Sequence, residues 1–146
     1  MKSNNGTEYG SGEIQQVVMT PFSFRGKIPT LGASPLCDPL NPNILGHRFT
    51  VFEITCLPSM LGQSYQDFVW IIVIDPDLPD EFRRRLEKLT SHREKTFLHE
   101  YAATTFTDVN WMRPYLPESM SYLLCSVLDD DDVLHRDFMQ ILRDNA

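Results

Sequence analysis

Four consecutive aspartates, at positions 129–132, are the residues of this chain whose type and spacing most clearly suggest chemistry. Like charges packed this closely repel one another unless a positive charge lies among them. Mg²⁺ and Mn²⁺ prefer carboxylate oxygen as a ligand, so a divalent-cation site is one interpretation. The alternative is a helix cap, where acidic side chains favour the helix dipole. One or two aspartates suffice for a cap, so four favour the cation site.

The segments on either side of the aspartates predict how they are positioned. Residues 122–128 form a short, nearly unbroken apolar run, which is typical of a strand buried on both faces. After the aspartates, apolar residues recur at helical spacing and predict an amphipathic helix over residues 133–145. The aspartates would then follow the carboxyl end of a buried strand, which is where open α/β sheets bind ligands.

Strands and helices alternate along the rest of the chain. The apolar run over residues 68–74 is β-branched and aromatic throughout, which predicts a central parallel strand. A first strand is predicted over residues 14–20, ended by Pro21, and a weaker one over residues 95–101. The alternation predicts the α/β fold class, with a Rossmann-like parallel sheet, right-handed crossovers and flanking helices.

Two helices are predicted between these strands. Apolar residues at helical spacing predict the first over residues 48–63, and Pro58 inside it predicts a kink or break at residues 55–56. The second begins after the strand at 68–74. Its cationic side chains are expected to face water, with an ion pair between Glu81 and Arg85.

The composition indicates one domain and excludes some classes of partner. The chain has 146 residues and a formal net charge of −7, which argues against nucleic acid as the main partner. Residues 1–13 are polar and predict a disordered tail, followed by a single domain over residues 14–146. Residues 28–46 are rich in proline and predict a long irregular connection.

The sequence also bears on membrane insertion and on the redox state of the cysteines. No apolar run approaches the roughly 20 residues that a membrane helix needs, and the start lacks an apolar signal core. Three cysteines without CxxC spacing are expected to be reduced, buried thiols in a cytoplasmic protein.

Two blocks of the sequence resemble known enzymes. Residues 52–75 resemble the opening of family-2-type glycosyltransferases of the GT-A fold, and Leu128 with the following aspartates resembles their D-x-D motif. The first block matches the family at Ser59, Gln63, Tyr65, Asp67 and Phe68. With Leu-Pro-Ser at 57–59 and the residues after the aspartates, the chain is most similar to the group called putative rhamnosyltransferases. The resemblance covers roughly residues 17–138.

The resemblance implies a function and a site. It implies metal-dependent transfer of a sugar, with rhamnose as the sugar of the family name, from a nucleoside-diphosphate sugar to a glycan or other hydroxyl acceptor. The residues implied to bind the nucleotide sugar are Thr20, Phe22, Asp75, Asp129 and Asp130. Asp129 and Asp131 are the implied ligands of Mn²⁺ or Mg²⁺. No catalytic base is identified.

Departures from the family leave two alternatives open. The chain ends soon after D-x-D, which suggests a partial GT-A domain with an exposed sheet edge, weak activity alone and self-association. One alternative is therefore a non-catalytic nucleotide-binding fragment. The other is a phosphotransferase of the haloacid dehalogenase type, in which Asp75 of the Asp-x-Asp at 75–77 would be the nucleophile.

Overall fold

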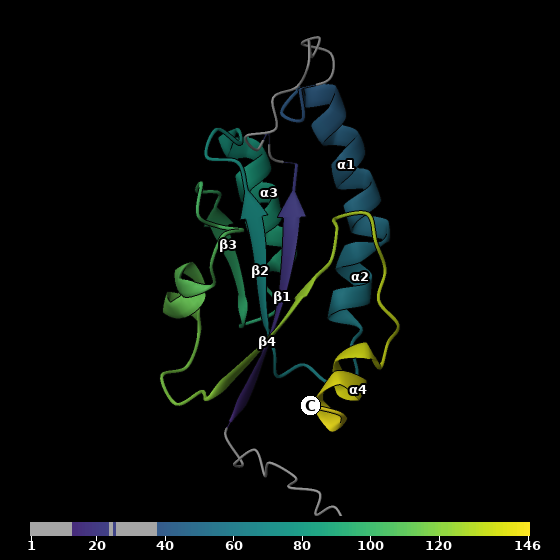
Figure 1. Cartoon of the computed structure of the whole chain (residues 1–146). Coiled ribbons are helices and arrows are strands. Elements are labelled where there is room, and N and C mark those ends of the chain that lie inside the picture. The colour runs from purple at the N-terminus through teal and green to yellow at the C-terminus, as the bar shows by residue number, and fades with distance from the viewer. Residues whose placement is uncertain (1–12, 24, 26–37) are drawn as a thin grey trace, which may run out of the picture.

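A computed structural model describes residues 13–23, 25 and 38–146 (Figure 1). In chain order its elements are β1 (Ile14–Phe22), α1 (Pro42–Ile54), α2 (Cys56–Leu61), β2 (Val69–Ile74), α3 (Asp80–Thr90), β3 (Thr96–Glu100), the 3₁₀ helix η2 (Asn110–Tyr115), β4 (Tyr122–Val127) and α4 (Phe138–Asp144). The expected tail over residues 1–13 lies outside the described residues except for its last position, as does most of the expected irregular connection.

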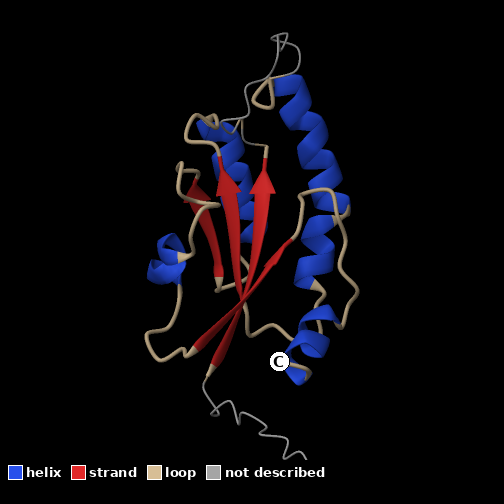
Figure 2. Cartoon of the chain, viewed as in Figure 1, coloured by secondary structure: helices blue, strands red, loops and turns tan. Residues whose placement is uncertain are grey.

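The strands of the described residues form one parallel sheet with the order β3-β2-β1-β4 (Figure 2). β1 pairs with β2 from Val17 opposite Val69, and on its other side with β4 from Ile14 opposite Tyr122. Parallel strands need crossover connections, which the helices provide here. This arrangement confirms the α/β class with a Rossmann-like sheet.

The core lies on both faces of β2, whose residues are all buried. Val-Trp-Ile-Ile-Val-Ile suits this position, because a central parallel strand has no polar face. On one face, Trp70, Ile72 and Ile74 pack in a cluster with residues of α1, α2, α3 and α4. On the other, Ile71 and Val73 pack with Met112 of η2 and its neighbours. The strand over 68–74 is thus confirmed as central, and residues 102–120 help to cover the second face.

The break predicted in the first helix is confirmed. α1 ends at Ile54 and α2 begins at Cys56, with Thr55 between them at φ −118° and ψ −85°. Pro58 has no N–H to donate to a carbonyl one turn earlier, so a continuous helix would lose that bond. At the break, the Thr55 N–H and hydroxyl both donate to the Val51 carbonyl, at 3.0 and 2.6 Å.

Pro21 does not end β1, contrary to the prediction. The strand continues to Phe22, with Pro21 opposite Val73. Met19 accepts a hydrogen bond from Leu128, so the backbone groups of Met19 point towards β4. Pro21, two residues on, points the same way, and its pairing partner β4 has already ended. Its missing N–H therefore removes no bond from the sheet.

Two predicted segments have different boundaries. α1 already begins at Pro42, inside the expected irregular connection, because proline fits the first turn of a helix and Asn41 caps it by accepting from the Asn43 N–H. The last helix begins at Phe138 instead of residue 133. The preceding residues are not helical, since the carbonyls of His135 and Arg136 accept hydrogen bonds from Gln63 and Ser64 near the end of α2.

The fourth strand is not buried on both faces, which corrects another prediction. β4 lies at the edge of the sheet, and no other strand of the described residues pairs with its outer side. The exposed fractions of Tyr122 and Val127 are 46% and 62%. The apolar run over residues 122–128 therefore predicted the strand correctly but not its exposure.

The side-chain predictions outside the site have mixed outcomes. Arg85 forms its ion pair with Glu53 of α1, not with Glu81, because Arg85 lies over the Phe49 ring beside that helix. Cys56 is buried as expected, whereas Cys125 is exposed. In the described part of the chain, every helix is too short or too polar to cross a membrane.

Candidate functional site

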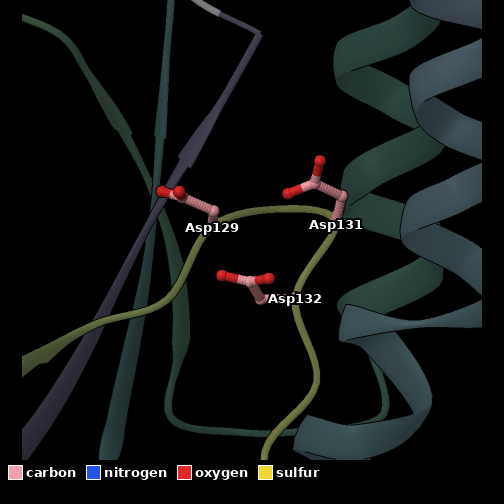
Figure 3. A group of neighbouring side chains, drawn as sticks. All are labelled: Asp129, Asp131 and Asp132. Carbon is pink, nitrogen blue, oxygen red and sulfur yellow. The ribbon is translucent and has the colours of Figure 1, made fainter.

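Three of the four aspartates bring their carboxylates together in the turn after β4 (Figure 3). One oxygen each from Asp129, Asp131 and Asp132 lies within 4.8 Å of the other two, and all three residues are exposed. The turn is closed by the Asp132 N–H, which donates to the Asp129 carbonyl at 3.1 Å. Oxygen ligands at about 2.1 Å from an octahedral Mg²⁺ are about 3–4 Å apart, so small side-chain rotations would complete such a site.

The two aspartates expected to bind metal, Asp129 and Asp131, are therefore placed side by side. Asp132 joins them, and sequence reasoning assigned it no role. Its neighbours in the sequence were the only signal for it, because the turn that folds Asp132 back is visible only in the structure. The carboxylate group fits a hard divalent cation, which prefers oxygen ligands.

Asp130 faces the opposite way from its neighbours. Its carboxylate is 2% exposed and accepts two hydrogen bonds from Arg48 of α1, from Nε at 3.0 Å and from Nη2 at 2.5 Å. Burial raises the pKa of Asp130, and the Arg48 charge and hydrogen bonds act in the opposite direction. The structure thus places Asp130 in an ion pair beneath the turn, and its predicted contact with the nucleotide sugar stays a prediction.

A cavity of about 450 Å³ lies beside the aspartate turn. Its described lining comes from the end of β1, the segment before α1, α1 itself and the turn after β4. The lining residues are Pro21, Ser23, Pro39, Ile44, Arg48, Asp129 and Asp131. Segments far apart in the sequence thus meet at the carboxyl ends of β1 and β4, which is the edge where open α/β sheets bind ligands.

The residues expected to line the nucleotide pocket from β1 lie in the core instead. Thr20 is fully buried, and its Oγ1 accepts a hydrogen bond from Trp70 Nε1 at 2.9 Å. Phe22 packs edge-on against Phe49, with ring centroids 4.8 Å apart. Alternate side chains of a strand point to opposite faces, so Pro21 faces the cavity from β1 instead. The predicted nucleotide contacts of Thr20 and Phe22 are not tested by this placement.

Asp75 closes the end of β2. It is 6% exposed, and its two oxygens each accept a backbone N–H, from Arg25 and from Asp77, both at 2.9 Å. The Arg25 guanidinium in turn contacts the carboxylates of Asp38 and Asp77. Through these hydrogen bonds, Asp75 connects Arg25, which follows β1, to the end of β2. This engagement does not favour Asp75 as a nucleophile, and its predicted contact with the nucleotide stays a prediction.

Residues of α2 and the segment after it hold the chain that follows the aspartates. Gln63 donates to the His135 carbonyl at 2.9 Å and accepts from the Met139 N–H at 3.1 Å. The Ser59 hydroxyl accepts from the Leu134 N–H at 3.4 Å. Ser59 and Gln63 are two of the residues that carried the resemblance, and the structure gives them a physical task in supporting the aspartate turn.

Cys56 lies in the core and is not a candidate nucleophile. The pKa of its thiol is raised to about 12, mainly by burial and also by the charges of Asp130, Asp132 and Asp131, while hydrogen bonding with Thr20 opposes the shift. A thiol with this pKa is neutral near pH 7, whereas thiol catalysis needs the thiolate. Its full burial and neutral thiol therefore argue against covalent chemistry through Cys56.

Comparison with known families agrees with the geometry. The family model described as "Putative rhamnosyl transferase" matches residues 39–146, which is more than half of the chain. The chain belongs to this family. The match includes Arg48, Asp75 and the aspartate turn, and it supports glycosyltransferase function at a coarse level. No curated protein and no solved structure matches the chain.

Proposed function

We propose that this protein transfers a sugar from a nucleoside-diphosphate sugar to a hydroxyl acceptor in a metal-dependent reaction, on a domain of the GT-A type. The observation that carries the proposal is the group of Asp129, Asp131 and Asp132 beside the cavity at the carboxyl edge of the sheet. Family membership supports sugar transfer, and rhamnose is the first sugar to test.

The three exposed carboxylates are the proposed holders of Mn²⁺ or Mg²⁺. Departure of the nucleotide places negative charge on a diphosphate, and a bound divalent cation would stabilise that charge. Asp129 and Asp131 also line the cavity, so the donor diphosphate would meet them there. Because Asp129 and Asp131 belong to the carboxylate group and also line the cavity, they, rather than Asp130, are the primary candidates for metal ligands.

The remaining lining residues would hold the donor in place. The Ser23 hydroxyl donates to the Pro39 carbonyl at 2.7 Å, which joins the end of β1 to the segment before α1. Pro21 and Ile44 contribute apolar surface to the same cavity. The described lining holds no imidazole, and its only carboxylates are those of Asp129 and Asp131. The proposal therefore covers donor binding and leaving-group stabilisation, and it assigns no base to the acceptor hydroxyl.

Calorimetry with a panel of nucleoside diphosphates, with and without Mn²⁺, tests the proposal. We expect one nucleotide to bind only when Mn²⁺ is present, and Asp131→Asn to abolish this Mn²⁺-dependent binding. The matched control is Asp144→Asn, which changes an exposed carboxylate on α4 that accepts from Gln140. A protein that binds none of the nucleotides, with or without Mn²⁺, would contradict the proposal.

A second measurement separates an enzyme from a non-catalytic nucleotide-binding protein. Release of free sugar from the matching nucleoside-diphosphate sugar reports cleavage of the donor bond even without a known acceptor. We expect slow Mn²⁺-dependent hydrolysis by the unmodified chain and none by Asp131→Asn. Tight binding of nucleotide without any hydrolysis or transfer would support the binding-protein alternative instead.

A further inference from the structure

An ion pair ties helix α1 to the aspartate turn. Asp130 is 2% exposed, and its two oxygens engage Nε and Nη2 of Arg48. A carboxylate this deeply buried needs a charged, hydrogen-bonded partner. Arg48 is therefore held on one side by a carboxylate whose own neighbours, Asp129 and Asp131, are the proposed metal ligands.

The other side of Arg48 faces the cavity. Its side chain is 38% exposed and forms part of the same lining as Asp129 and Asp131. No other described lining residue carries a positive charge. Within residues 13–23, 25 and 38–146, Asp130 is the only acceptor that Arg48 engages. Since a guanidinium has five N–H donors, those of Nη1 are left to bind a ligand in the cavity.

We propose that Arg48 binds the diphosphate of the donor, and that Asp130 is a positioning residue that holds the guanidinium plane towards it. This inference rests on the proposed function and adds to it the residue that meets the phosphate oxygens. Arginine suits that task because its planar fork matches phosphate oxygens in two parallel hydrogen bonds.

Charge balance gives a separate reason for a cation at this place. The three carboxylates of the turn outweigh the two positive charges of one divalent ion. A diphosphate brings further negative charge, which grows on the leaving group during transfer. Arg48 is paired with Asp130, but Arg48 lines this cavity and Asp130 does not, so a diphosphate there would meet the guanidinium and not the Asp130 carboxylate.

Binding of inorganic pyrophosphate in the presence of Mn²⁺ tests the role of Arg48 without knowledge of the nucleotide. Arg48→Gln alone leaves Asp130 buried without a charged partner and can prevent folding. The paired change of Arg48→Gln with Asp130→Asn keeps two amides that can bond to each other, and Arg48→Lys keeps the charge but not the fork. Arg85→Gln is the matched control, because Arg85 also pairs with one carboxylate, that of Glu53, outside the cavity.

By calorimetry, we expect the paired variant to bind Mn²⁺-pyrophosphate about 10- to 100-fold more weakly than the unmodified chain, as for loss of hydrogen bonds to a charged group. Arg48→Lys should lie in between, and Arg85→Gln should match the unmodified chain. Each folded variant should still bind Mn²⁺ alone. Circular dichroism and a cooperative melt identify the folded variants.

Two results would overturn the inference: equal pyrophosphate affinity in the unmodified chain and the paired variant, or no pyrophosphate binding by the unmodified chain. Donor hydrolysis separates this failure from failure of the proposed function. If the unmodified chain hydrolyses a nucleoside-diphosphate sugar while the Arg48 variants bind pyrophosphate normally, the function stands and the role of Arg48 falls. If Arg48 proves necessary for pyrophosphate but no nucleotide sugar is bound or cleaved, the function falls.

Discussion

Replacing Thr20 by valine separates a core role from a binding role at the end of β1. Thr20 Oγ1 accepts the hydrogen bond of Trp70 Nε1, and both side chains are fully buried. Valine has nearly the same shape, so the change removes the acceptor without leaving a large hole. The indole N–H would then be buried without a partner, since water does not reach it.

The expected cost follows from that lost partner. A buried donor left unsatisfied costs about 1–3 kcal/mol in the free energy of unfolding. In a domain of this length, that corresponds to a fall of about 3–9 °C in the melting temperature. We expect urea and thermal melts of Thr20→Val to show this loss, with the affinity for Mn²⁺ and nucleoside diphosphate unchanged.

Ser23→Ala is the control for this experiment, because Ser23 lies three residues further on and lines the cavity. Its hydroxyl is partly buried and joins β1 to Pro39, so nucleotide affinity should change more than stability. Unchanged stability of Thr20→Val would mean that Trp70 finds another acceptor. Loss of nucleotide affinity at full stability would instead show that Thr20 contacts the ligand, as the family resemblance implies.

Three further predictions concern the metal, a buried arginine and pH. Asp131→Asn should remove the rise in melting temperature that Mn²⁺ gives the unmodified chain; an unchanged rise in a thermal-shift assay would exclude Asp131 as a ligand. Arg93→Met should lower the free energy of unfolding in urea melts by about 3–5 kcal/mol, because its buried guanidinium donates to backbone carbonyls just before β2 and β3. A loss below about 1 kcal/mol would refute this. Stability should fall as pH rises from about 9 to about 12, since the unfolded chain loses the Cys56 proton near pH 9 while the folded thiol keeps it up to a pKa of about 12. Urea melts across this range should show up to about a tenfold change in the folding equilibrium per pH unit, and Cys56→Ala should lack this component; an identical slope in the variant would contradict the assignment.

Apolar patterns predicted which segments are strands and helices, and the central place of β2, but not how little of β4 is covered. The runs that became β2 and β4 are both nearly continuous, yet β2 is covered on both faces and β4 lies at an edge. An apolar run says that side chains are suited to burial, whereas strand order depends on pairing between distant segments. The same limit applies to Pro21, whose effect on β1 depends on where β4 ends.

Likewise, the sequence predicted some residues of the candidate site and missed others. The aspartate run pointed to a cation site because carboxylates in series after a strand are a chemical signal in their own right, and the family resemblance then singled out Asp129 and Asp131. The role of Arg48 was not predicted, because a cationic residue beside the apolar stripe of a helix is usually a solvent-exposed surface residue. Its partner Asp130 lies 82 positions away, and only the packing of α1 against the turn brings the two together.

The hydrogen bonds that Ser59 and Gln63 form with residues 134–139 have a consequence for the conformational entropy of the aspartate turn. The turn is fixed at one end by the pairing of Leu128 with Met19 and at the other by Gln63. Residues ordered before a ligand arrives contribute little to the entropic cost of binding it. Gln63, which is not part of the carboxylate group, would therefore favour binding of the proposed ion by restricting the freedom of the loop rather than by touching the ion. Shortening Gln63 would free the loop, so the affinity for the ion would fall although every carboxylate remained.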